Sequence, residues 1–159
     1  MIKSYVTKYP NKKVLVFTET KEDAKKFAFL DYARFTPIHG DLDQARRRKI
    51  LSDFAHPKSK NILVATDVAA RGLDIEDIDA VFQFDVRMVN SFIHRAGRTG
   101  RKGKEGLNVL LLTREKLDFA KECEQQLQIK FGYSNSMLDL KEEESLKEDA
   151  LKSAMKNVN

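Results

Sequence analysis

The sequence contains a single cysteine, Cys123, so no disulfide can form within the chain. Such sparing use of cysteine is typical of a reducing, intracellular compartment, and the helical pattern around Cys123 favours a packing role over a nucleophilic one. The sequence also lacks a long apolar run and a cleavable leader, which predicts a soluble, unexported chain with no membrane partner. Internal repeats and low-complexity tracts are absent as well. The 159 residues, 42% of them hydrophobic, therefore predict one globular domain with a substantial core.

Positive charge is in modest excess and is unevenly distributed. The formal net charge is +5, yet residues 139–149 carry six acidic and two basic side chains, a net of −4. The rest of the chain therefore carries +9. A chain whose residues outside 139–149 are this basic favours a polyanionic partner.

Short apolar runs alternate with amphipathic stretches along the chain. The runs predict strands over residues 14–17, 36–38, 61–65, 80–84 and 107–112. The amphipathic stretches predict helices over residues 2–9, 43–54, 89–96 and 115–127, and a further helix that begins after a cap at Thr20. A peripheral charged helix is predicted over 143–155. Alternation at this spacing predicts βαβ units with right-handed crossovers. The expected fold is α/β, with a mostly parallel sheet covered by helices on both faces.

Three of these helices carry specific expectations. Thr20 is expected to cap its helix, with Asp23 three residues later completing a variant of the capping box. The helix over 43–54 is expected to bury three residues and to turn four outward (Ile50, Leu51 and Phe54 inward; Arg46, Arg47, Arg48 and Lys49 outward). The helix over 115–127 is expected to turn Leu117, Ala120 and Leu127 inward.

Polar residues follow several of the predicted strands. In parallel α/β folds the functional residues lie at the carboxyl ends of the strands, a rule that selects residues 18–20, 39–41, 66–67 and the segment after Phe84. These clusters are therefore expected on one edge of the sheet. Taken singly, Thr66 also fits a capping hydroxyl, Asp74 a turn residue, and the basic run a solvated helix face.

Residues 94–101, with the sequence His-Arg-Ala-Gly-Arg-Thr-Gly-Arg, concentrate arginine and glycine more than folding alone requires. Arg98 and Arg101 are three residues apart, so both can point at one anion, and the guanidinium fork suits phosphate oxygens. The alternative is an ordinary Arg/Gly-rich surface loop. Phe92 and Ile93 favour the functional interpretation, because they can anchor the preceding helix in a core.

Four motifs in this order and spacing resemble the second RecA-like domain of DEAD-box RNA helicases. They are Phe-x-x-Thr at 17–20, Gln-x-x-Arg at 44–47, Ala-Arg-Gly-x-Asp at 70–74, and His-Arg-x-Gly-Arg-x-Gly-Arg at 94–101. The resemblance covers about residues 12–131. It implies a RecA-like three-layer sandwich over residues 1–131, followed by a partly helical peripheral extension over 132–159. Residues 19–21, 68–75 and 129–131 are similar to nucleolar Gu-type members, which implies a nuclear or nucleolar location.

The resemblance also implies a role for each matching residue. Arg98 and Arg101 match arginine fingers that reach the γ-phosphate of ATP on a partner lobe, and His94 matches a residue that links the lobes. Asp74 matches a carboxylate that accepts a hydrogen bond from the ribose of ATP. Interlobe or structural roles fall to Arg71, Arg95 and Gln44. Sequence-independent contacts to the RNA backbone fall to Thr20, Gly40, Arg47 and Thr66.

The sequence departs from the family at some points. It has Asp85-Val86-Arg87 where many members have a proline, and Asn90 where an acidic residue is common, which bears only on local loop geometry. It contains neither Gly-x-x-x-x-Gly-Lys-[Ser/Thr] nor Asp-Glu-Ala-Asp, so the phosphate cradle and the magnesium-binding acids are missing. His39 and His94 lie too far apart, without Cys or carboxylate partners at ligand spacing, to predict a metal site.

These absences predict that the chain is one half of a longer enzyme. ATP and Mg²⁺ are then expected mainly on a missing N-terminal lobe, and the chain alone is expected to be an inactive monomer whose partners are that lobe and RNA. The alternative is a non-catalytic RecA-like module that binds RNA or protein. The pair Arg98 and Arg101 argues against it, because a pure binding module has no need of two fingers aimed at an interlobe phosphate.

Overall fold

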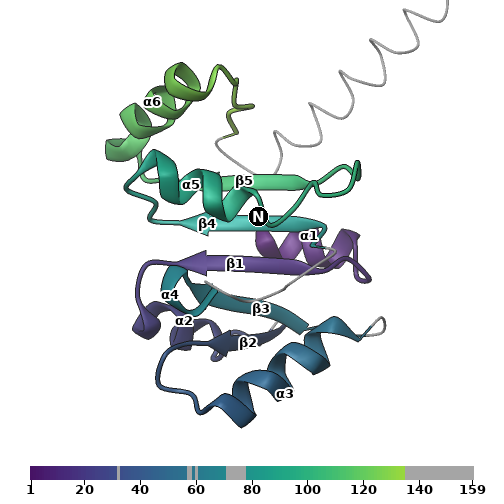
Figure 1. Ribbon diagram of the computed structural model, residues 1–159. Coiled ribbons are helices and arrows are strands. Elements are labelled where there is room, and N and C mark those ends of the chain that lie inside the picture. Colours follow the sequence, from purple (N-terminus) through teal and green to yellow (C-terminus); the bar gives the residue numbers. More distant parts are fainter. Residues whose placement is uncertain (32, 57–58, 60, 71–77, 135–159) are drawn as a thin grey trace, which may run out of the picture. The chain divides into compact units, whose positions relative to one another are not determined.

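Five parallel β-strands form one sheet in the computed structural model, which describes residues 1–31, 33–56, 59, 61–70 and 78–134 (Figure 1). The strands are β1 (Val14–Thr18), β2 (Arg34–Ile38), β3 (Asn61–Thr66), β4 (Ala80–Phe84) and β5 (Leu107–Leu111). Their spatial order is β2-β3-β1-β4-β5, and every neighbouring pair is parallel. The predicted α/β fold with a parallel sheet is confirmed.

Strand β1 lies at the centre of the sheet because it is apolar on both sides. All five of its residues are buried, including Thr18. Val14 pairs with Ile62 of β3 on one side and with Ala80 of β4 on the other. A continuous apolar run of this kind is expected of a strand covered on both faces.

Helices cover both faces of the sheet. They are α1 (Ile2–Lys8), α2 (Lys21–Phe27), α3 (Gln44–Ala55), α4 (Asp67–Ala70), α5 (Val89–Ala96) and α6 (Leu117–Leu127), with a 3₁₀ turn at Arg114–Lys116. On one face the rings of Tyr5 in α1 and Phe27 in α2 lie 5.7 and 5.4 Å from those of Phe82 and Phe84. Among the described residues, no helix is both long and apolar enough to cross a membrane.

The other face carries an extended apolar cluster. It consists of Leu15, Phe17, Ile38, Phe54, Leu63, Ala65, Ala70, Ile78 and Val81, with Leu42, Ile50 and Leu51 packed against it. Helix α3 supplies Phe54, Ile50 and Leu51, so its predicted inner face is confirmed. The outward prediction was wrong for Arg47, which is half-buried and donates a hydrogen bond from Nη2 to the carbonyl of Ala69, 3.1 Å away.

Helix α6 is anchored by the predicted face except at its first residue, since Ala120 is buried and Leu127 is partly buried. Leu117 is 43% exposed, because a 3₁₀ turn precedes it and the α-helix only begins there. Ala120 is buried as expected, and Cys123 is fully buried beside it. Burial, with a smaller contribution from Glu122, raises the pKa of the Cys123 thiol and keeps it protonated. The packing role predicted for this cysteine agrees with its position.

The chain divides into a compact unit, Ile2–Ile129, and a second unit made of Met1 and Lys130–Asn159. All elements named above belong to the first unit. The helix predicted over 143–155 lies outside the described residues.

Candidate functional site

The strand register brings the ends of β1, β2 and β3 to the same edge of the sheet. Thr18 pairs with Thr66, and Ile38 pairs with Ala65. Thr20, Gly40 and Thr66 are therefore presented by three neighbouring strand ends, as the sequence predicted for parallel strands.

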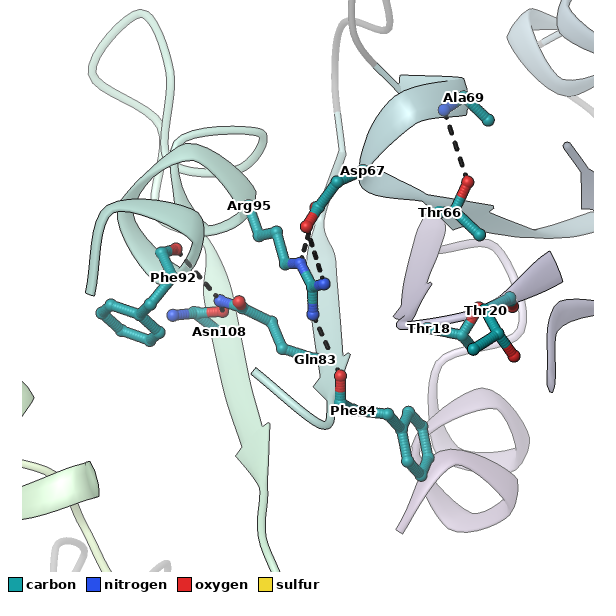
Figure 2. Close-up of polar contacts among 10 residues, drawn as sticks. All are labelled: Thr18, Thr20, Thr66, Asp67, Ala69, Gln83, Phe84, Phe92, Arg95 and Asn108. Atoms are coloured by element: carbon teal, nitrogen blue, oxygen red, sulfur yellow. Dashed lines mark hydrogen bonds and ion pairs between the residues drawn. The ribbon is translucent and has the colours of Figure 1, made fainter. Parts of the chain in front are cut away.

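Thr20 forms the predicted cap of α2. Its Oγ1 accepts a hydrogen bond from the backbone N–H of Asp23 at 3.1 Å and donates one to Asp23 Oδ2 at 2.7 Å. The buried hydroxyl of Thr18 donates to the carbonyl of Thr20 at 3.1 Å, which fixes the turn between strand and helix. Thr20 itself remains exposed beside this anchored turn (Figure 2).

Thr66 and Arg47 meet at the same residue of α4. Thr66 is buried, and its Oγ1 accepts a hydrogen bond from the backbone N–H of Ala69 at 3.4 Å (Figure 2). Arg47 binds the carbonyl of the same residue. The short helix α4, which sequence reasoning missed, is thus held at both its N–H and its C=O groups.

Gly40 lies in an open part of the same edge. It is exposed, and a Cβ atom added to it would meet nothing within 4 Å. Its neighbour His39 is buried, and burial, assisted by the charge of Lys25, lowers the pKa of His39, so the ring is neutral near pH 7. Gln44 is exposed at the first position of α3, which is capped by Asp43.

Arg95 is fixed by three side-chain hydrogen bonds within the domain. Only 2% exposed, it donates from Nε and Nη2 to the carboxylate of Asp67 at 2.7 and 2.8 Å, and from Nη1 to the carbonyl of Phe84 at 3.0 Å (Figure 2). Its guanidinium also lies 5.3 Å from the centroid of the Phe17 ring. These three hydrogen bonds join α5 to α4 and to β4.

A second polar contact fixes α5 to the sheet. Gln83 of β4 is fully buried and donates from Nε2 to Asn108 Oδ1 at 2.8 Å and to the carbonyl of Phe92 at 3.4 Å (Figure 2). With Arg95, this contact holds both the middle and the end of α5. The segment that follows the helix therefore begins from a fixed point.

The arginine segment lies at the opposite edge of the sheet from Thr20 and Thr66. Thr99 forms a parallel bridge with Ile78, and its Oγ1 donates to the carbonyl of Ile78 at 2.6 Å. Ile78 precedes β4, so this contact marks the amino ends of the strands. The rule that selects carboxyl ends does not account for this segment, because α5 runs back along the sheet before the arginines begin.

Arg98 and Arg101 line one small cavity of about 50 Å³. Its lining consists of Ile78, Asp79, Arg98, Gly100, Arg101, Lys102, Lys104 and Glu105. Arg98 is half-buried, whereas Arg101 is exposed and donates from Nε to the carbonyl of Gly97 at 2.7 Å. His94 is exposed on the last turn of α5. The structure thus brings the two arginines together, and their own charges give this cavity, which two lysines and two carboxylates also line, its net positive charge.

The loop that carries the arginines depends on a close approach at Gly106. A Cβ atom there would lie 2.2 Å from Thr99 Oγ1 and 2.5 Å from the backbone nitrogen of Gly100. We expect Gly106→Ala to lower the free energy of unfolding by about 2 kcal/mol, because the loop must move to relieve the overlap. Chemical denaturation measures this. Gly40→Ala is the matched control and should leave stability within about 0.5 kcal/mol of the parent; equal losses in both variants would contradict the prediction.

Arg71 and Asp74 lie outside the described residues. Within the part of the chain that the structure describes, no group of three or more His, Cys, Asp or Glu side chains is placed to hold a metal ion. The site consists of two parts: strand-end residues at the carboxyl edge and basic residues at the amino edge.

Comparison with known proteins relates this arrangement to one family. Residues 1–103 match the family described as "Helicase conserved C-terminal domain". The chain is 44% identical over 132 residues to "ATP-dependent RNA helicase DDX42" of Xenopus laevis, covering 80% of this chain and 14% of that protein.

Two solved structures of Mss116p are similar in fold and sequence. "Mss116p DEAD-box helicase domain 2 bound to an RNA duplex" superposes with a TM-score of 0.69 at 32% identity, covering 86% of this chain and 57% of the other. Mss116p "bound to ssRNA and AMP-PNP" gives a TM-score of 0.70 at 31% identity, covering 85% and 29%. The predicted RecA-like fold is confirmed by these neighbours.

Proposed function

Because this chain belongs to the helicase C-terminal domain family, as found in DEAD-box RNA helicases, we propose that it is the carboxyl-terminal lobe of an ATP-dependent RNA helicase. In the complete enzyme the lobe closes on RNA and on ATP carried by an N-terminal lobe. The observation that carries the proposal is the pairing of Arg98 and Arg101 around one basic cavity, on a loop rooted in the fixed helix α5.

The arginine segment serves the ATP side of this function. When the lobes close, the guanidinium groups of Arg98 and Arg101 stabilise negative charge on the γ-phosphate during transfer. His94 contacts the other lobe from the end of α5, while Asp74 accepts a hydrogen bond from the ribose and Arg71 joins the interlobe contacts. ATP and Mg²⁺ are held mainly by the N-terminal lobe, since this sequence has no phosphate cradle or Asp-Glu-Ala-Asp of its own.

The carboxyl edge serves the RNA side. The hydroxyl of Thr20, the backbone amide of Gly40 and the hydroxyl of Thr66 hold the sugar-phosphate backbone, which positions a strand without reading its sequence. Arg47 also contacts the RNA backbone in this proposal, and it has a second role within the domain. By binding the carbonyl of Ala69 it also holds the segment that carries Thr66. The RNA complexes of Mss116p support the assignment, because those proteins share this fold.

Assays on the isolated chain test whether ATP hydrolysis requires the second lobe and whether RNA binding does not. We expect it to hydrolyse ATP no faster than background, even with RNA, because half of the ATP site is absent. Its binding to single-stranded RNA should be weak, insensitive to sequence and steeply dependent on salt. Steady-state ATPase assays and fluorescence anisotropy over a salt series measure both properties.

Two results would count against this proposal. ATP turnover that survives further purification and disappears in Arg98→Ala would show that the lobe needs no partner for catalysis. Tight RNA binding at high salt, or a strong preference for one sequence, would favour the non-catalytic binding module.

The proposal extends to subfamily, location and assembly. The similarity of residues 68–75 to nucleolar Gu-type members supports a nuclear or nucleolar protein. Imaging of the tagged complete protein tests this location. The lobe is proposed to act as a monomer, which light scattering of the purified chain tests.

A further inference from the structure

Two lysines and one aspartate form an ionic cluster beside Gly40. Lys21 and Lys25 lie one turn apart on α2, and their Nζ atoms are 3.0 and 3.2 Å from Oδ1 and Oδ2 of Asp41. Each carboxylate oxygen therefore takes one ammonium group. Hydrogen bonds from both lysines lower the pKa of Asp41, so the carboxylate is ionised at neutral pH.

The ion pairs of this cluster contribute little to the stability of the fold. The three side chains are 45–46% exposed, and ion pairs at such exposure contribute little to folding. Beneath them, His39 Nδ1 is buried without a hydrogen-bond partner, 3.9 Å from Asp41 Oδ2. Groups built only to stabilise a fold seldom leave a buried ring nitrogen unpaired. The unpaired His39 nitrogen therefore lies next to the carboxylate that the two lysines hold.

The charge and shape of the cluster fit a phosphate. Two ammonium groups face a single carboxylate while His39 is neutral, so these four groups carry a net positive charge, although Glu22 also acts electrostatically on Lys21 and His39. A phosphodiester has two non-bridging oxygens and one negative charge, so it can take both lysines as the carboxylate does. The position agrees with this fit, because Lys21 follows Thr20 and Asp41 follows the open residue Gly40.

We propose that Lys21 and Lys25 form a further phosphate subsite for the RNA backbone, and that the Asp41 carboxylate occupies this subsite when RNA is absent. The inference rests on the proposed function, since it extends the RNA path along the carboxyl edge. RNA binding exchanges one anionic partner of the lysines for another, with no change in covalent bonds. Asp41 thereby lowers the affinity of the chain for RNA, and its removal raises that affinity.

Binding of a fluorescent single-stranded oligouridylate to the full chain, measured by anisotropy over a salt series, tests the subsite. Lys21→Ala/Lys25→Ala should weaken binding at low salt by roughly tenfold and reduce the slope of log affinity against log salt by about 0.7, the contribution of one neutralised phosphate on a single strand. Asp41→Asn should tighten binding by roughly threefold, because it frees both lysines and removes a negative charge near the phosphate.

Lys26→Ala is the matched control. Lys26 lies on the same helix but pairs with Asp23 at 2.7 Å and is 75% exposed, so its removal should change affinity less than about twofold. The thermal midpoint of each variant is measured alongside, and Lys21→Gln/Lys25→Gln replaces the alanine variant if that variant unfolds early. The subsite is overturned if the double variant binds like Lys26→Ala, or if Asp41→Asn weakens binding. A parent chain without salt-dependent RNA binding would instead overturn the proposed function itself.

Discussion

Replacing Arg101 by alanine in the complete two-lobe protein is expected to lower ATP turnover by roughly a hundredfold or more, the scale seen when a transition-state cation is removed. The affinity for ATP should change little, because in the proposed function the other lobe supplies most of the ground-state contacts. Arg101 is exposed and beside Arg98 at a basic cavity, so the variant should fold normally. Steady-state turnover and nucleotide affinity, measured at saturating RNA, separate the two effects.

Two further variants make this assignment specific. Arg101→Lys should remain impaired, because a point charge does not reproduce the guanidinium fork. Arg47→Ala should raise the RNA concentration needed for stimulation and spare turnover at saturating RNA, since the contact proposed for Arg47 is to the RNA backbone. If Arg101→Ala only shifts the RNA dependence, or Arg47→Ala abolishes turnover at saturating RNA with its fold intact, the two roles are assigned wrongly.

Arg95→Ala is expected to lower the free energy of unfolding by about 3 kcal/mol, the lower end for breaking a buried ion pair, because Asp67 is partly exposed. The substitution removes two hydrogen bonds to Asp67 and one to the carbonyl of Phe84, and it leaves a void beside Phe17. Urea denaturation of the isolated chain measures the loss. This test requires neither the second lobe nor bound ATP or RNA.

The control for Arg95 is an ion pair whose side chains are largely exposed to solvent. Lys121 and Asp118 lie 2.9 Å apart on α6 with both side chains largely exposed, so Lys121→Ala should cost less than about 0.5 kcal/mol. A loss for Arg95→Ala as small as this would show that the Asp67 contact is not what fixes α5.

The regular elements were accessible from sequence because their patterns are strong and local. The buried run of β1, the capping of α2 by Thr20 and the extent of α5 follow from neighbouring residues alone. Helix α4 was missed, because four residues carry no periodicity. Leu117 was misplaced for a related reason: a helical pattern does not reveal that a 3₁₀ turn sets the start of α6.

The site was only partly predictable for a different reason. Motif spacing singled out Arg47 and Arg95, but their partners Ala69 and Asp67 are remote in sequence and come from the α4 segment. The pattern of α3 predicted that Arg47 faces solvent. Periodicity describes the faces of a single helix and does not show that α4 packs against its first turn. The edge on which Arg98 and Arg101 lie depends on the length of α5, which the strand-end rule does not consider.

The central position of β1 has a consequence for how the chain reaches its native state. Val14 pairs with Ile62 and Ala80, so neither edge of this apolar strand is satisfied until much later segments have been synthesised. Such non-local pairing is slow and leaves strand edges open to other chains. On the ribosome, β2 and β3, which are neighbours in both sequence and sheet, are free to associate first. The central strand of the finished domain is therefore separated from its first pairing partner by more of the chain than any other strand of the sheet.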